Sequence, residues 1–314
     1  MKNLAVIVLI TAVGAVAQGS RPKILGVAHM ALYVSDLGKA RAFYKDLLGY
    51  DEPYLLKRQD GSERIVFLKV NEDQYLELFA EQPKNDGQLH HIAFYTDDAK
   101  AMRDYVAAQG VRVPGEVGKG QIRNSNFNIT DPDGNTVEIV QYEPDSWTRR
   151  ERGRFIPETR ISTRILHLGV LVGDLDASMK FYGGILGFRE IWRGGAGPQL
   201  SWVNMRVPDG EDYLEFMLYN TPQDKRQLGV KNHICLVTPD IEKAVKTLES
   251  RPARKQYAQP IEIRTGVNRK RQANLFDPDG TRVELMEPHT VDGKPAPPST
   301  APPPPAQKRS NTAP

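Results

Sequence analysis

The chain carries four pairs of side chains that can bind a metal ion, and the members of each pair stand at matching positions in its two halves. Four of the six histidines belong to these pairs. Histidines without a shared constraint would rarely stand at matching positions in both halves. Two imidazoles and two carboxylates form a mixed donor set that suits a divalent metal ion such as Ni, Zn, Co, Mn or Fe. The pairs are His29 and His167, Glu77 and Glu215, His91 and His233, and Glu138 and Glu284.

This donor set predicts a metal centre that could do chemistry. A divalent ion can polarise a carbonyl oxygen and stabilise an enediolate, and a carboxylate at the edge of the site can move a proton. We assign the catalytic role to Glu138 and Glu284, the last donors of each half. A single glutamate would be better explained by an exposed strand face or a salt bridge, but the aligned set of eight favours metal binding. His90 would face away from His91 on a strand, so we assign it a supporting or structural role.

A long internal repeat explains the pairs. The segment "ILGVAHMALYVSDLGKARAFYKDLLGY" at 24–50 matches "RILHLGVLVGDLDASMKFYGGILGF" at 164–188, and from His29 to His167 the lag is 138 residues. The lag grows to 146 at the turns "DPDGNTVEIV", which begins at 131, and "DPDGTRVELM", which begins at 277. Insertions of this size are expected in surface loops.

The sequence of each half predicts the same order of strands and helix, and this order occurs twice in each half. A strand that carries a histidine is followed by apolar residues at helical spacing, which begin after an aspartate that can cap the helix and end before a glycine. More extended chain follows, and each DPDG turn predicts a hairpin. Strand alternation puts His29 on one face with Val27, Ala31 and Tyr33, so the polar groups point where apolar groups point. We therefore expect an α+β protein of four βαβββ units, two in each half.

The chain resembles the vicinal oxygen chelate superfamily, which includes glyoxalase I, extradiol ring-cleaving dioxygenases, and fosfomycin and bleomycin resistance proteins. The resemblance lies in the histidine strand followed by "FYKDLLGY" or "FYGGILGF", and in the two DPDG segments. It covers residues 24–144 and 164–288, with 145–163 as a linker, and implies two modules built on curved mixed sheets. It also implies metal ligands on the first and last strands of the units, at the eight positions named above.

The resemblance leaves three functions open. The first is a divalent-metal-dependent, glyoxalase-like lyase or isomerase that acts on a small substrate through a metal-bound vicinal oxygen or an enediolate. The second is a ring-cleaving dioxygenase, with His167, His233 and Glu284 as its ligands. It is less favoured because the second module lacks a further histidine before His233 and has Asn274 where those enzymes have a tyrosine. The third is a non-catalytic, small-molecule-binding protein of the resistance type.

The repeat allows two arrangements of the ligands. In a closed arrangement each module makes its own site, whereas in an exchanged arrangement His29 and Glu77 meet His233 and Glu284. The linker could span roughly 65 Å when extended, so chain reach excludes neither. Glu77 and Glu215 resemble carboxylates of glyoxalase I, whose sites lie between modules, and we therefore expect the exchanged arrangement.

The start of the chain predicts export. Residues 1–17 combine a lysine after the initiator, an apolar run from Leu4 to Val13, and Ala15-Val16-Ala17 as a cleavage signal. The run is shorter than the roughly 20 residues that a spanning helix needs. We expect a periplasmic or extracellular protein with no stable membrane insertion after the signal is removed.

The other end and the charge balance say less about function. Residues 289–314 are rich in proline and poor in large apolar side chains, so we expect a disordered tail. The formal charge of +3, from 42 Lys and Arg against 39 Asp and Glu, does not argue for nucleic acid, and we expect a small-molecule substrate and a monomer or homodimer. Basic stretches at 148–164 and 264–272 are solvated faces or help to hold an anionic substrate. The lone Cys235 rules out an intrachain disulfide.

Overall fold

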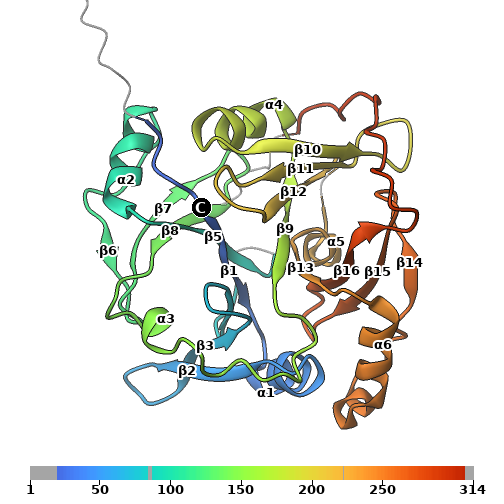
Figure 1. Ribbon diagram of the computed structural model, residues 1–314. Coiled ribbons are helices and arrows are strands. Elements are labelled where there is room, and N and C mark those ends of the chain that lie inside the picture. The colour runs from blue at the N-terminus through green and yellow to red at the C-terminus, as the bar shows by residue number, and fades with distance from the viewer. Residues whose placement is uncertain (1–19, 84–86, 222, 308–314) are drawn as a thin grey trace, which may run out of the picture.

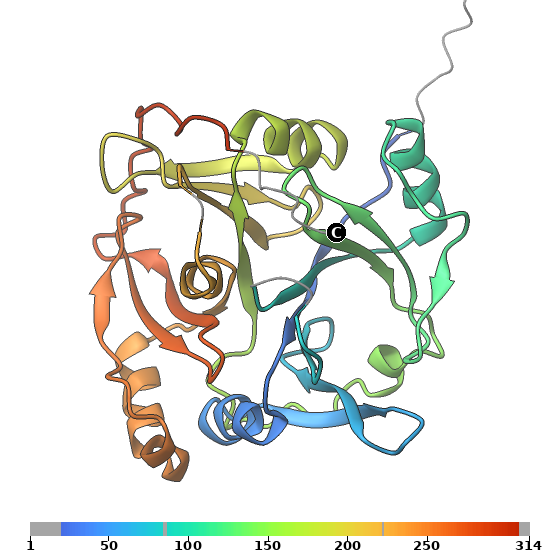
Figure 2. The same cartoon turned by 180° about the vertical axis from the view of Figure 1, so that it is seen from behind.

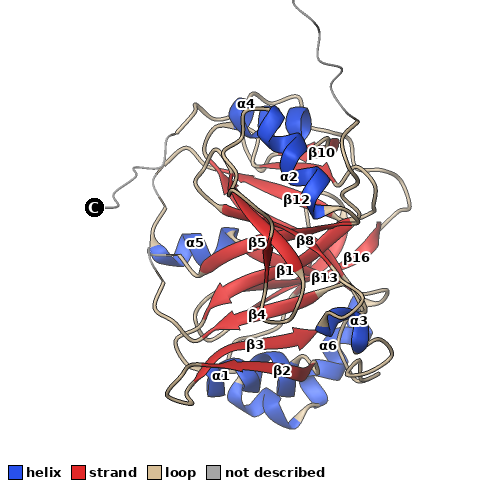
Figure 3. Ribbon diagram, turned by 90° about the vertical axis from the view of Figure 1, so that its left-hand side faces the viewer, coloured by secondary structure: helices blue, strands red, loops and turns tan. Residues whose placement is uncertain are grey.

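Two curved mixed sheets, each of eight strands, form the body of the protein (Figure 1). This computed structural model describes residues 20–83, 87–221 and 223–307, so the predicted export signal lies outside the described residues. Helices lie above and below the strands in the side view of Figure 3. Within the described ranges, none of the helices is long and apolar enough to cross a membrane.

The first sheet takes all its strands from the first module, in the order β2-β3-β4-β1-β5-β8-β7-β6. Its central strand β1 runs parallel to β4 and antiparallel to β5. The strands are β1 (Gly26–Tyr33), β2 (Asp51–Lys57), β3 (Glu63–Lys69), β4 (Tyr75–Phe79), β5 (Leu89–Thr96), β6 (Gly118–Lys119), β7 (Ser125–Thr130) and β8 (Thr136–Gln141). The helices are α1 (Leu37–Arg41), which continues as η1 (Ala42–Leu47), and α2 (Ala99–Ala108).

The second sheet repeats this topology in the order β10-β11-β12-β9-β13-β16-β15-β14. Its strands are β9 (Ile165–Val172), β10 (Arg189–Gly194), β11 (Trp202–Arg206), β12 (Tyr213–Leu218), β13 (His233–Val237), β14 (Ile263–Thr265), β15 (Lys270–Phe276) and β16 (Arg282–Thr290). Its helices are α4 (Leu175–Ser178) with η2 (Met179–Ile185), α5 (Lys225–Lys231), and α6 (Ile241–Ser250) with η3 (Pro252–Gln256). The four predicted βαβββ units are confirmed.

Local sequence fixes where the helices begin and end. Asp36 accepts a hydrogen bond from the Lys39 backbone at the start of α1, and Asp174 does the same for Ala177 at the start of α4. Each aspartate satisfies a backbone N–H that would have no partner inside the helix. After the helices, Gly49 and Gly187 take φ of 83° and 79°, a left-handed conformation that glycine adopts without strain.

The two modules hold each other through the repeated motifs. Tyr44 of η1 donates a hydrogen bond to Asp277 in the second DPDG turn at 3.0 Å, and Tyr182 of η2 donates one to Asp131 in the first turn at 2.9 Å. The pairs are equivalent under the repeat, so the contact is reciprocal. Buried apolar residues of both modules form one core, in which the rings of Phe94 and Phe188 lie 5.0 Å apart.

The predicted linker is part of the first module's inner wall. Its short helix α3 (Trp147–Arg150) places Trp147 among the rings of Tyr54, Phe67 and Tyr75 on the concave face of the first sheet. The buried Lys69 donates hydrogen bonds to the backbone carbonyls of Glu151 and Arg154 in the same segment. These contacts hold the segment against the sheet.

The expectation of a loop at the insertion before His233 is wrong, although the segment does lie at the surface. The insertion before His233 forms part of helix α5, which Figure 2 shows end on in the hollow of the second sheet, and Leu228 packs against Leu171, Met217 and Tyr219.

The tail is ordered over residues 291–307. Its backbone makes hydrogen bonds between Ser299 N and Arg193 O, Leu200 N and Pro302 O, and Gln307 N and Gly173 O. It runs along the second module as the red segment in Figure 1. Proline lacks a donor but keeps its carbonyl, so a proline-rich segment can still bond to neighbouring loops.

Candidate metal centre

Four neighbouring strands bring the first set of ligands together. His29 lies on β1, Glu77 on β4, His91 on β5 and Glu138 on β8, and these strands are adjacent in the order β4-β1-β5-β8. The four side chains therefore meet inside one module. The expected exchanged arrangement is wrong, because the pairing of β1 with β5 joins both units of a module into one sheet.

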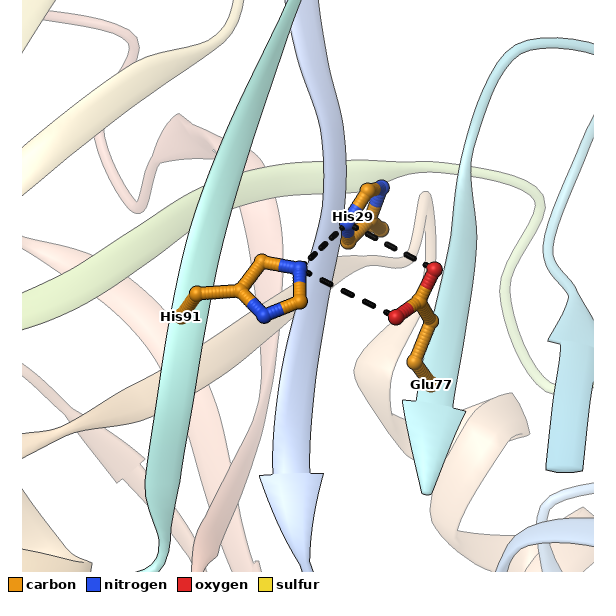
Figure 4. A group of neighbouring side chains, drawn as sticks. All are labelled: His29, Glu77 and His91. Carbon is orange, nitrogen blue, oxygen red and sulfur yellow. Dashed lines mark hydrogen bonds and ion pairs between the residues drawn. The ribbon is translucent and has the colours of Figure 1, made fainter. Parts of the chain in front are cut away.

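The donor atoms of this first centre converge on one point. His29 Nε2 lies 2.8 Å from His91 Nε2 and 3.1 Å from Glu138 Oε2. Glu138 Oε2 is 2.9 Å from His91 Nε2. Glu77 stands slightly apart, with its carboxylate oxygens 3.6 Å from His29 Nε2 and 3.8 Å from His91 Nε2 (Figure 4).

The first centre is buried, and its two carboxylates differ. Burial raises the pKa of Glu77 to about 8, with His91 opposing this and Glu138 adding to it. Burial alone would also raise the pKa of Glu138, but hydrogen bonds from His29 and His91 hold it well below its usual range. Two buried carboxylates that lie this close together need a cation to compensate their charge. Two imidazoles and two carboxylates directed at one point fit a divalent ion.

An aromatic wall and a cavity adjoin the first centre. The ring of Tyr75 stacks on His29 at 4.6 Å, which fixes the orientation of the imidazole. A cavity of about 240 Å³ opens beside Glu77, His91 and Glu138. Its other lining residues are Leu56, Arg64, Ile65, Phe67, Tyr75, Phe79, Gly120, Gln121, Ile122, Asn124 and Asn126. A small substrate could therefore reach the ligands.

His90 lies on the same side as His91, contrary to the expectation from strand alternation. On β1, Ala31 pairs with His91 and the next residue pairs with Leu89, so His90 is the extra residue of a β-bulge. A bulge breaks the two-residue alternation of side chains. The Nδ1 atoms of His90 and His91 lie 2.8 Å apart, and the His90 ring stacks on Phe79 at 4.0 Å.

The second set of ligands also meets within one module, but more loosely. His167 Nε2 lies 3.1 Å from His233 Nε2. Glu284 Oε2 is 3.4 Å from His167 Nε2 and 3.6 Å from His233 Nε2. Glu215 Oε2 lies 3.7 Å and 3.5 Å from the same two nitrogens. All eight predicted ligands therefore belong to two clusters of four.

The second cluster also contains residues that the sequence did not predict there. Cys235 lies close enough to His167 and Glu284 to share a ligand group with them, and its position two residues after His233 on a strand could have revealed this. Arg282 Nη2 lies 2.8 Å from both ring nitrogens of His233. Burial, together with the positive charge of Arg282, lowers the pKa of His233 to about 3.

Curated proteins resemble one module at a time. A lactoylglutathione lyase of Haemophilus influenzae is 34% identical over 129 residues, which are 40% of this chain and 92% of that protein. The lactoylglutathione lyase of Escherichia coli O157:H7 is 30% identical over 129 residues, with the same coverage. A probable chloroplastic lactoylglutathione lyase of Arabidopsis thaliana is 29% identical over 128 residues, and the match spans only 35% of its length.

Solved structures match the whole two-module fold. A variant of homoprotocatechuate 2,3-dioxygenase from Brevibacterium fuscum superposes with a TM-score of 0.63 at 20% identity, over 85% of this chain and 72% of that one. The 2,3-dioxygenase LapB from Pseudomonas sp. KL28 gives a TM-score of 0.63 at 18% identity, over 88% of this chain and 97% of that one. At these identities the likeness shows the fold.

Both modules match one family model, over residues 26–139 and 164–285. These ranges contain most of the two sheets, the two clusters of ligands and both DPDG turns. The chain belongs to the Glyoxalase/Bleomycin resistance protein/Dioxygenase superfamily.

Proposed function

We propose that this protein is a divalent-metal-dependent, glyoxalase-like lyase or isomerase that transforms a small oxygenated substrate at the first centre. The observation that carries the proposal is the fourth donor, Glu77, which faces Glu138 across the two histidines and lines the cavity. A ligand set of two histidines and one carboxylate would leave Glu77 without a role. Relatives named as lactoylglutathione lyases support the reaction class.

The ion would be held by His29, Glu77, His91 and Glu138, a donor set that suits Ni, Zn, Co, Mn or Fe. When bound, such an ion polarises a carbonyl oxygen and stabilises negative charge on it. Glu138 is fixed by hydrogen bonds from both imidazoles. Glu77 makes only longer contacts with them, so it is free to turn toward the cavity.

We therefore give Glu77 the role that the sequence suggested for Glu138. Glu77 would take a proton from the hydroxyl-bearing carbon next to the substrate carbonyl and return it to the carbonyl carbon, as a general acid and base, while the hydroxyl proton passes to the former carbonyl oxygen. Glu138 would remain in place and orient the two imidazoles. Asn124, Asn126 and Gln121 line the cavity and supply neutral donors and acceptors for substrate hydroxyls.

The test is proton exchange at the substrate carbon. The purified chain, loaded with Ni²⁺, Co²⁺, Zn²⁺, Mn²⁺ or Fe²⁺, is incubated in D₂O with a 2-oxoaldehyde and glutathione, and with a panel of small α-hydroxycarbonyl compounds. Nuclear magnetic resonance follows deuterium incorporation and product formation. We expect Glu77→Gln to abolish exchange while keeping most of the metal, and Glu138→Gln to release the metal.

Binding of these compounds to the loaded protein without exchange or product would instead support the resistance-type, non-catalytic alternative. Loss of metal in both variants, with equal loss of exchange, would remove the distinct role given to Glu77.

A second candidate is a ring-cleaving dioxygenase, which His90 favours. The first module has this further histidine beside its second ligand, whereas the second module has Asn232 there. His29, His91 and Glu138 would then be the three ligands and His90 a proton donor or acceptor for bound substrate. Oxygen consumption by the Fe²⁺-loaded chain with catechols would distinguish this reaction from the first.

A further inference from the structure

The two ligand clusters differ in the charges that surround them. In the first module, positions equivalent to Lys270 and Arg282 under the 146-residue lag are Asn124 and Thr136, both neutral. The strand registers agree, since Asn128 pairs with Glu138 on β8 as Asn274 pairs with Glu284 on β16. The second cluster therefore has two basic side chains at positions that are neutral in the first module, where Arg64 at the cavity edge is paired with Glu81.

Arg282 lies within the second cluster. It is two residues before Glu284 on β16, so both side chains point to the concave face. Its Nη2 atom is 2.8 Å from Nδ1 and from Nε2 of His233, which places the guanidinium over the imidazole ring. A metal ion bound at His233 Nε2 would lie against this positive charge, and like charges at such a separation in a buried site repel strongly.

Lys270 adds a second positive charge. It lies on β15, beside β16, where burial lowers its pKa and the nearby Cys235 and Glu284 oppose this. With Arg282 it gives two positive charges against the two carboxylates Glu215 and Glu284. The second cluster thus reaches charge balance with its own side chains, as buried charged groups require.

The residue that pairs with His233 on the neighbouring strand also differs between the modules. A Cβ at Gly169, the residue that pairs with His233, would lie 1.9 Å from His233 Nδ1. In the first module the equivalent residue is Ala31, which pairs with His91. The His233 ring therefore occupies the space that a methyl group fills beside His91, and its Nδ1 contacts the Lys231 carbonyl at 2.8 Å.

We infer that the second cluster is a metal-free ionic core in which Arg282 and Lys270 offset the charge of the two carboxylates, so that the protein binds one divalent ion, in the first module. The basic side chains neutralise Glu215 and Glu284 in the place of an ion. The second module then serves to support the first, and its ligand set is structural.

Metal stoichiometry of the full chain tests this inference. The protein is stripped with a chelator, titrated with Co²⁺ or Ni²⁺, passed through gel filtration and analysed for metal by mass spectrometry. We expect one ion per chain, lost in His29→Ala and kept in His167→Ala. Two ions in the wild type, or one ion that is lost in His167→Ala and kept in His29→Ala, would overturn the inference.

A swap between equivalent positions gives the matched controls. Arg282→Thr combined with Lys270→Asn installs the residues of the first module, and we expect a second ion per chain together with a rise in melting temperature when metal is added. Thr136→Arg should weaken binding at the first centre at least tenfold. Arg282→Lys keeps the charge and should not create a second site.

The swap remains decisive if the proposed function fails. A wild type that binds one ion in the first module but shows neither exchange nor product would refute the proposed reaction and leave the inference standing. A double variant that keeps its circular dichroism spectrum and gains no ion would overturn the inference in either case.

Discussion

At the residue scale, one buried carboxyl in each DPDG turn joins the two modules. Asp277 accepts hydrogen bonds from the backbone N–H groups of Asp279 and Thr281 and from the Tyr44 hydroxyl. Burial nevertheless dominates and raises the pKa of Asp277 to about 7. The folded state therefore favours the protonated carboxyl.

This shift predicts a pH-dependent stability. Because the pKa of Asp277 is higher in the folded state than its ordinary value of 3.8, its contribution is full below about pH 4 and is lost as the pH rises through about 7. Relative to Asp277→Asn, the wild type should lose up to roughly 4 kcal/mol between these values. Urea denaturation of both proteins from pH 4 to pH 8 measures this difference, with the exposed Asp176→Asn as a charge-matched control. A difference that does not change with pH would contradict the prediction.

Metal removal gives a second prediction at this scale. An ion held by His29 and its neighbours binds only the folded state, and it adds about 2.7 kcal/mol of stability at one hundred times its dissociation constant. A chelator should therefore lower the melting temperature of the wild type and leave that of His29→Ala unchanged. Equal shifts in both proteins would show that the ion binds elsewhere.

At the scale of elements, the tail acts as a strap over the second module. Three of its backbone hydrogen bonds reach β10, the loop before β11, and Gly173 between β9 and α4. Truncation after Thr290 removes them and should lower the free energy of unfolding by about 1–3 kcal/mol. Truncation after Gln307, which keeps all three, is the control. Equal unfolding midpoints for both truncations would rule out a stabilising strap.

The sequence predicted the helices and strands better than it predicted which strands pair with one another. The repeat and the aspartate and glycine at the ends of α1 and α4 act locally, so the four units and the eight residues that meet in the two clusters could be identified. The pairing of β1 with β5 is a contact between distant segments that the linker length leaves open, and it decides which ligands meet. The bulge at His90 shifts one residue without a mark in the hydrophobic pattern.

Two expectations outside the sheets failed for a related reason. The growing lag predicted a loop before His233, and the lack of large apolar residues predicted a disordered tail. The order of both segments comes from the partner surface, where Leu228 packs against Leu171 and Met217 and where backbone groups of other loops bond to the tail. The partner surface forms only when distant parts of the chain fold together, so the local sequence does not predict it.

At the scale of the whole molecule, the reciprocal tyrosines should couple the two modules energetically. Tyr44→Phe and Tyr182→Phe each leave a buried aspartate without one donor, which should cost about 1–3 kcal/mol. The two losses should add, because the pairs share no partner.

Double-mutant cycles measured by urea denaturation test this expectation. A cycle of Tyr44→Phe with Asp277→Asn should show coupling, and a cycle of Tyr44→Phe with Asp131→Asn should show none. Coupling of similar size in both cycles would mean that the contacts do not act pairwise.

The reciprocal contact has a consequence for ancestry. Tyr44 and Asp131 lie on the same module, and they bond to Asp277 and Tyr182 of the other module. One module therefore carries both the donor and the acceptor of a two-fold symmetric contact. Two identical copies of such a unit could form this contact as a symmetric pair, and this chain is the covalent form of that pair. Fusion frees the copies from having to be identical. Substitutions such as Arg282 and Lys270 could then enter one half only, which no assembly of identical subunits permits.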